Sequence, residues 1–152
     1  MSDDIKEIVK NKKANFEYHV LETFEAGMVL KGTEVQSIRQ KKVNIQEGYA
    51  FIKKEEVYIT GMNVTPYEQG NRYNHEPLRE RKLLLHKSEI KKLNGKLKER
   101  GYTLVPLKLY FKNGKVKLLL GLAKGKAEYD KRETIQKRES DRELQRMIKK
   151  YK

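Results

Sequence analysis

The chain has 152 residues, of which 35 are Lys or Arg and 21 are Asp or Glu, so its formal net charge is +14. That length suits a single domain, and the surplus of cations favours a polyanionic partner without specifying a fold. The absence of Cys excludes disulfides, thiolate catalysis and thiolate zinc sites, and the apolar runs are too short for a membrane span. We therefore expect a cytoplasmic protein with an anionic partner and no membrane association.

The N-terminal part predicts strands followed by a short helix. Residues 1–10 are expected to be a flexible leader. The segments Phe16–Phe24 and Ala26–Lys31 are rich in aromatic and β-branched residues, which predicts strands that meet at a bend or bulge at Gly27. The capping-box pattern of Thr33–Gln36 then predicts a helix that ends near residue 40.

The middle of the chain predicts a hairpin and a second helix. Tyr49–Lys53 and Val57–Val64 are strand candidates on either side of a polar turn. Ser88 is the expected N-cap of the helix that follows, and Gly101 is its expected C′ residue. The buried stripe of that helix is expected to contain Ile90, Leu93 and Leu97.

The clearest prediction is a hairpin over Tyr102–Leu122, because Asn113-Gly114 supplies the two positive φ angles of a type I′ turn. That register pairs Tyr110 with Lys117. Alternation along the strands then predicts a core face and a basic outer face. The core face contains Leu107, Leu109, Phe111, Val116, Leu118 and Leu120, and the outer face contains Lys108, Tyr110, Lys112, Lys115 and Lys117.

These elements predict a mostly β (α+β) fold, a small antiparallel barrel of the oligonucleotide-binding (OB) type with two or three short helices. A flat α+β sheet is the alternative. The barrel domain is expected over residues 11–124. Residues 125–152 carry many charges and few large apolar side chains, so this basic C-terminal tail is expected to be disordered when free.

Signatures of catalysis are weak. The segment Gly121–Ala127 has three residues between its glycines where a P-loop needs four, and the three His residues are far apart in the sequence. We expect no enzyme activity, no metal site and no cofactor, and the main alternative with catalysis is a nuclease. The loop Glu68–Lys82 interleaves Arg, Asn, His and Tyr, which suits contacts to RNA phosphates and unpaired bases.

Several motifs occur in a familiar order and resemble those of the SmpB family, the SsrA-binding proteins of bacterial trans-translation. They are Phe24–Gly27, Gly32–Val35, Arg81–His86, Thr103–Lys108, Leu122–Lys126 and Tyr129–Glu133. The resemblance covers the chain from Asn11 onward. It implies an OB-like barrel that binds the tRNA-like domain of transfer-messenger RNA (tmRNA) and, with elongation factor Tu, delivers it to stalled ribosomes. It further implies a tail that enters the vacant mRNA channel at the small-subunit decoding centre and becomes helical there.

The resemblance and the hairpin register together indicate two sets of site residues. The expected tmRNA-binding residues are Asn11, Lys12, Tyr18, Glu25, Arg79, Arg81, Lys82, Leu84, Lys108, Tyr110 and Lys117. The expected ribosome-binding tail residues are Gly125, Lys126, Tyr129, Asp130, Lys131 and Arg132. Leu84 is equally well interpreted as a core residue. Gln36, Lys41 and Ala127 depart from the usual family pattern, and a ribosomal or RNA-chaperone protein without tmRNA specificity is the alternative function.

Overall fold

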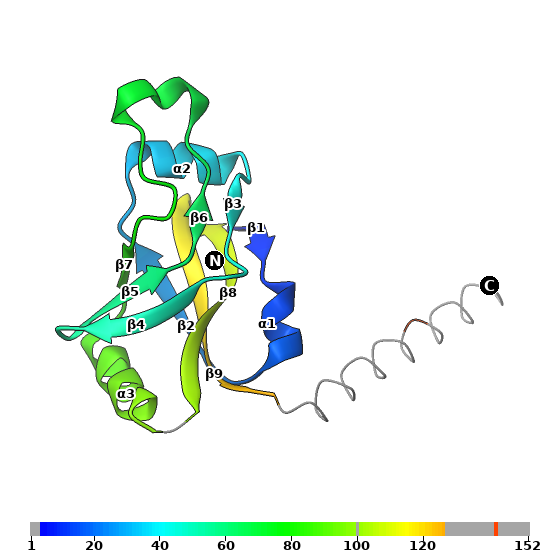
Figure 1. The fold of residues 1–152 in the computed structure, drawn as a ribbon, viewed down its shortest axis with the longest axis vertical. Helices are drawn as coiled ribbons and strands as arrows, with labels where there is room; N and C mark the ends of the chain where they lie inside the picture. The colour runs from blue at the N-terminus through cyan, green and yellow to red at the C-terminus, as the bar shows by residue number, and fades with distance from the viewer. Residues whose placement is uncertain (1–3, 100, 127–141, 143–152) are drawn as a thin grey trace.

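The computed structural model describes residues 4–99, 101–126 and 142, and the side chains of residues 71–73 are outside that description. The chain is built mainly from β-strands (Figure 1). The strands are β1 (Ile5–Lys10), β2 (Tyr18–Met28), β3 (Val43–Asn44), β4 (Tyr49–Lys53), β5 (Glu56–Thr60), β6 (Asn63–Val64), β7 (Arg81–Leu84), β8 (Tyr102–Lys112) and β9 (Lys115–Gly125). The helices are α1 (Lys12–Glu17), α2 (Gly32–Arg39), α3 (Lys87–Leu97) and the 3₁₀ turn η1 (Glu68–Tyr73).

The main sheet is antiparallel and closes on itself. Its strand order is β1-β8-β4-β5-β7-β2-β9, and β8 also pairs with β9. The strands β4, β5, β7, β2, β9 and β8 therefore form a closed ring, which removes the free edges that an open sheet would expose. This arrangement confirms the predicted mostly β fold and excludes the flat sheet. Its closed form is consistent with an OB-like barrel.

The core lies inside the ring and is closed at its two ends by helices. Side chains from opposite walls, such as Ile59 and Leu118, are completely buried there. Ile38 of α2 and Leu93 of α3 are also completely buried, and these two helices lie at opposite ends of the barrel (Figure 1). The predicted stripe of α3 is confirmed, because Ile90 and Leu97 pack against the same core.

Both predicted hairpins are confirmed, but the predicted strand Val57–Val64 is divided. β5 ends at Thr60, and Asn63–Val64 form β6, which pairs with β3 in a separate sheet. In the β8–β9 hairpin, Asn113 (φ 51°) and Gly114 (φ 80°) form the turn, and Tyr110 pairs with Lys117 as the register requires. In the β4–β5 hairpin, the turn residues Lys54 and Glu55 both have positive φ angles. The core assignment fails at Leu107, because a β-bulge between Pro106 and Lys108 shifts this side chain to a second cluster outside the barrel, beside Ala14.

The N-terminal prediction needs correction. Residues 5–10 are not a leader in this structure, because β1 pairs with the second half of β8. Phe16 lies in α1 and not in a strand. Asn11 is the N-cap of α1, since its side-chain oxygen accepts a hydrogen bond from the Ala14 backbone N–H at 3.1 Å.

The predicted caps of the two longer helices are also wrong. The N-caps are Lys31 and His86, two residues before Thr33 and Ser88. In both helices the third residue is a glutamate that accepts a hydrogen bond from the N-cap backbone N–H, at 2.8 Å for Glu34 and 3.0 Å for Glu89. Gly101 has φ 91° but lies beyond the C′ position, because the C-cap of α3 is Lys98.

Candidate nucleic-acid interface

Leu84 and Lys117 are brought together by a glycine that pairs with both of them. Gly27 of β2 lies opposite Leu84 on one side and Lys117 on the other. A Cβ atom on Gly27 would lie 3.3 Å from Leu84 Cβ and 3.7 Å from Lys117 Nζ. The absence of a side chain at Gly27 therefore lets two side chains from separate strands approach each other on the outer surface of the barrel.

Leu84 is not a core residue, because 51% of its surface is exposed. It lines a surface groove of about 380 Å³ together with Gly27, Met28, Lys115 and Lys117. An exposed apolar side chain beside two lysines provides a contact surface for a nucleoside and cations for its phosphates. The interpretation of Leu84 as a binding residue is therefore favoured over the core interpretation.

Glu25 lies on the same face, two residues before Gly27. Its Oε2 accepts a hydrogen bond from the Tyr110 hydroxyl at 2.6 Å, and Lys112 Nζ lies 3.2 Å from its Oε1. These two donors, Tyr110 foremost, hold the pKa of Glu25 below its usual value. Tyr110 itself is 5% exposed, and burial together with the bond to Glu25 raises the pKa of its hydroxyl. Glu25 is therefore a fixed carboxylate within a basic face.

The lysines of the outer face differ in their partners. Lys112 pairs with Glu25, and Lys108 Nζ lies 4.0 Å from Glu7 Oε1. The neighbouring strands β1 and β2 thus supply acidic partners, Glu7 and Glu25, which the outer face of the β8–β9 hairpin does not contain itself. Within the described part of the chain, Lys115 and Lys117 form no ion pair, so they remain the cations available to a phosphate.

Arg81 is predicted as an RNA contact, but its side chain is completely buried, so this structure does not present it to RNA. Its Nε donates to Glu34 Oε2, and its NH1 donates to the carbonyl oxygens of Met62 and Arg79, each at 2.9 Å. Burial lowers the pKa of Arg81, although Glu34 opposes that effect. Arg81 therefore fixes the loop that precedes β7 and does not face solvent.

The other cations of this motif are already engaged with carboxylates. Arg79 NH2 lies 2.6 Å from Glu34 Oε1, and 27% of the Arg79 side chain is exposed. Lys82 Nζ lies 2.8 Å from Glu56 Oε1, which raises the pKa of Lys82 and lowers that of Glu56. Arg79 and Lys82 can therefore contact RNA in two ways only. They contact it while still paired with Glu34 and Glu56, or they exchange these carboxylates for a phosphate.

The N-terminal site residues divide into one buried and two accessible side chains. Asn11 is 4% exposed, and its Nδ2 donates to the Pro106 carbonyl at 2.7 Å, so this structure does not present it to RNA. Lys12 is exposed on α1. Tyr18 is half-buried and pairs with Gly125 at the end of β9.

The start of the expected tail belongs to the folded domain. Gly125 is the last residue of β9, and the Lys126 backbone N–H donates to the Glu17 carbonyl at 2.7 Å. The domain therefore extends to residue 126. Tyr129, Asp130, Lys131 and Arg132 lie outside the described residues, as does most of the tail that was expected to be disordered.

One residue of the loop before β7, His75, is less accessible than the composition of the loop indicates. His75 is buried, and its two ring nitrogens lie 2.9 Å from Thr33 Oγ1 and 2.8 Å from the Val64 carbonyl oxygen. Both nitrogens are therefore used to attach the loop to α2 and β6. His75 is not free to hydrogen-bond a base.

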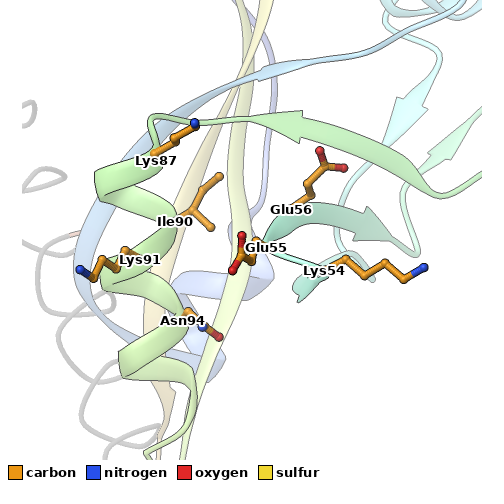
Figure 2. Close-up of a pocket in the computed structure, with 7 residues that line it drawn as sticks. All are labelled: Lys54, Glu55, Glu56, Lys87, Ile90, Lys91 and Asn94. Atoms are coloured by element: carbon orange, nitrogen blue, oxygen red, sulfur yellow. The ribbon is translucent and has the colours of Figure 1, made fainter.

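The structure presents no catalytic grouping in the described residues. No three His, Cys, Asp or Glu side chains come close enough there to hold a metal ion. A groove of about 480 Å³ lies between α3 and the β4–β5 turn (Figure 2), with Ile90 pointing toward the turn and Lys54 pointing outward. Its lining contains lysines and glutamates but no nucleophile beside a base. No helix in the described ranges is long and apolar enough to cross a bilayer.

Comparison with known proteins identifies the family of this chain. The family model described as "SmpB protein" matches residues 8–150. The chain is 60% identical over 141 residues to an SsrA-binding protein of Anoxybacillus flavithermus (strain DSM 21510 / WK1), covering 93% of this chain and 92% of the relative. It is 57% identical over 141 residues to the SsrA-binding protein of Bacillus subtilis (strain 168), covering 93% and 90%.

A solved structure described as "tmRNA-SmpB: a journey to the center of the bacterial ribosome" matches with a TM-score of 0.67 and 46% identity. That match covers 84% of this chain and 93% of the solved chain. The order of motifs, the closed antiparallel sheet and these matches lead to one assignment. The chain belongs to the SmpB family.

Proposed function

We propose that this protein is a non-enzymatic RNA-binding adaptor of trans-translation, which binds the tRNA-like domain of tmRNA and delivers it to stalled ribosomes. Relatives at 57–60% identity are SsrA-binding proteins, and the solved structure at 46% identity is described as tmRNA-SmpB in the bacterial ribosome. The observation that carries the proposal is the cluster of Leu84, Lys117 and Glu25 around Gly27 on one outer face.

The chemistry of this face suits a folded RNA. Lys115 and Lys117 supply cations for the phosphates, Leu84 supplies an apolar contact, and Glu25 is a hydrogen-bond acceptor. Because an ionised carboxylate repels phosphate, an RNA must present a base or a sugar hydroxyl at Glu25. A mixed surface of this kind recognises one RNA shape better than a uniformly basic one.

The proposal extends to the partners and the tail. Elongation factor Tu accompanies the aminoacylated RNA, and the protein acts in the cytoplasm, where ribosomes stall. Residues beyond Lys126, including Tyr129, Asp130, Lys131 and Arg132, bind the decoding centre and the vacant mRNA channel. The attachment of Lys126 to α1 supports a folded domain that reaches at least this residue.

The first experiment compares the affinity of the tRNA-like domain of tmRNA with that of an RNA hairpin of equal length, by fluorescence anisotropy. We expect Lys117→Glu to weaken binding of the tRNA-like domain roughly 10-fold or more, because a charge-assisted contact is lost. Lys91→Glu is the matched control, because it makes the same charge change on α3, in the groove of Figure 2. Equal binding of both RNAs favours the RNA-chaperone alternative, and cleavage of labelled RNA with Mg²⁺ refutes the adaptor function.

A second experiment separates the domain from the tail. A chain truncated after Lys126 should keep its affinity for the tRNA-like domain but lose peptide tagging on stalled ribosomes in a reconstituted translation system. A parallel loss of both activities contradicts the division between domain and tail.

A further inference from the structure

A row of aromatic side chains lies on the outer face of the β4–β5 hairpin. The rings of Tyr49 and Phe51 are 6.4 Å apart between centroids, and those of Phe51 and Tyr58 are 6.0 Å apart and stacked. Their neighbours Ala50, Val57 and Ile59 point into the core, so alternation directs the three rings outward. Tyr49 is 53% exposed.

The row continues into a groove beside α3. This groove has a volume of about 360 Å³, and its lining includes Phe51 of β4, Leu97 and Lys98 near the end of α3, and Tyr102 of β8. The Tyr102 ring already interacts with cations, since Lys124 Nζ and Lys96 Nζ lie 4.5 Å and 5.7 Å from its centroid. The groove therefore combines two aromatic rings with several lysines.

The charges around these rings favour an anionic occupant. Two carboxylates near the rings, Glu47 and Glu56, are each paired with a lysine at 2.8 Å, and Glu99 lies 3.8 Å from Lys96. Glu55, in the β4–β5 turn, is exposed and forms no ion pair among the described residues. Lys53 at the end of β4 and Lys98 at the end of α3 are exposed and form no ion pair within the described residues. Three of these four carboxylates are thus paired, while Lys53 and Lys98 remain as cations beside the rings.

We propose that this aromatic face, consisting of Tyr49, Phe51, Tyr58 and Tyr102 with Lys53 and Lys98, binds a single-stranded segment of RNA. Unpaired bases stack on Tyr49 and Phe51 and enter the groove beside Tyr102, and the phosphates lie near Lys53 and Lys98. Aromatic rings combined with cations are the usual means of binding single-stranded nucleic acid, because every base has a face that can stack. Core residues of a protein interface are depleted in charge, which makes a protein partner a poorer fit.

The aromatic face is separate from the interface at Leu84 and Lys117. Around the closed ring, β4 is separated from β2 by β5 and β7 in one direction and by β8 and β9 in the other. The two surfaces therefore lie on opposite sides of the barrel, so that one protein can bind a folded RNA and a single strand together. This inference goes beyond the proposed function and does not require the folded partner to be tmRNA.

The test uses the full chain and a fluorescein-labelled ten-nucleotide oligouridylate. Tyr49→Leu should lower the affinity for this probe roughly 5- to 100-fold, because a stacking surface is lost, whereas Tyr49→Phe should keep it. Lys117→Glu should leave binding of the oligonucleotide unchanged, and Tyr49→Leu should leave binding of the tRNA-like domain unchanged. An RNA duplex of ten base pairs should compete poorly with the single strand.

Aromatic NMR spectra of the wild-type protein provide a second readout that does not depend on any variant folding. Addition of the oligonucleotide should shift the ring resonances of Tyr49, Phe51 and Tyr102 but not those of Tyr110. The proposal is overturned if these rings do not shift, if Tyr49→Leu binds as well as wild type, or if the duplex competes equally. A different result would show that the proposed function fails, namely equal binding of the tRNA-like domain and the control hairpin.

Discussion

Replacement of Glu34 by Gln tests whether the buried ion pair between Glu34 of α2 and Arg81 of β7 stabilises the fold. Glu34 and Arg81 are both completely buried, and Glu34 also accepts hydrogen bonds from Arg79 and the Lys31 backbone. Removal of one charge from a buried pair costs about 3–5 kcal/mol, because the partner is left without its counter-charge. The carbonyl partners of Arg81 remain in the variant, so we expect the lower half of that range.

For a chain of this size each kcal/mol corresponds to about 2–4 °C, so Glu34→Gln should lower the melting temperature by roughly 6–16 °C. Urea and thermal denaturation followed by circular dichroism measure this difference. The matched control is Glu22→Gln, which removes the same charge from the partly exposed pair with Lys92 and should cost less than about 1 kcal/mol. If Glu34→Gln is as mild as Glu22→Gln, the buried pair does not stabilise the fold.

The pH dependence of the same variant gives an independent check. Burial opposes ionisation of Glu34, but its hydrogen bonds from Arg79, Lys31 and Arg81 outweigh burial and hold its pKa below the usual 4.5. A carboxyl with a depressed pKa contributes stability above its unfolded-state pKa, and this contribution is lost as the pH falls through the folded-state pKa. The difference in stability between wild type and Glu34→Gln should therefore be complete near neutral pH and shrink below about pH 4.5. A difference that is constant with pH contradicts the assignment.

Three further predictions concern the strands and the basic face. Tyr110→Phe removes the hydroxyl that donates to Glu25, so the pKa of Glu25 should rise toward its usual value in a carbon-13 NMR titration, and an unchanged pKa refutes the role of that bond. Deletion of residues 2–10 removes β1 from β8 and should lower the urea midpoint, whereas a flexible leader would be lost without effect. Lys117→Ala should reduce the salt dependence of binding to the tRNA-like domain by about 0.7–0.9 in slope, and an unchanged slope excludes a phosphate contact by Lys117.

The β8–β9 hairpin could be predicted in register because its turn residues have a specific conformational preference. Asn and Gly tolerate the positive φ angles that a two-residue type I′ turn requires. The β4–β5 turn also has positive φ angles, at Lys54 and Glu55, although neither residue is the Gly or Asn that usually indicates such a turn. Its position followed from the flanking apolar alternation, but its conformation depends on the strands that it connects.

The buried cluster and the first strand could not be predicted from local pattern. Arg81 and Glu34 are separated by 47 positions, and cations in a polar loop are ordinarily solvated. β1 pairs with residues 108–112 of β8, whereas β4 pairs with β8 near its other end, at Leu104. The aromatic row was also missed, although the i, i+2 spacing of Tyr49 and Phe51 on a predicted strand could have indicated it.

The position of Glu25 explains why net charge alone does not define the RNA that this face accepts. Its carboxylate engages Lys112 and Tyr110, so the cations left for phosphate are concentrated at Lys115 and Lys117 of β9, which lies across β2 from β7. A polyanion that lies uniformly across the face meets a fixed negative charge, which costs binding energy unless a base or sugar hydroxyl occupies that point. If the face binds RNA as proposed, Glu25 should therefore disfavour RNAs that place a phosphate at that point. The buried Glu34–Arg81 pair lies at the start of the strand that carries Leu84, because Arg81 is the first residue of β7.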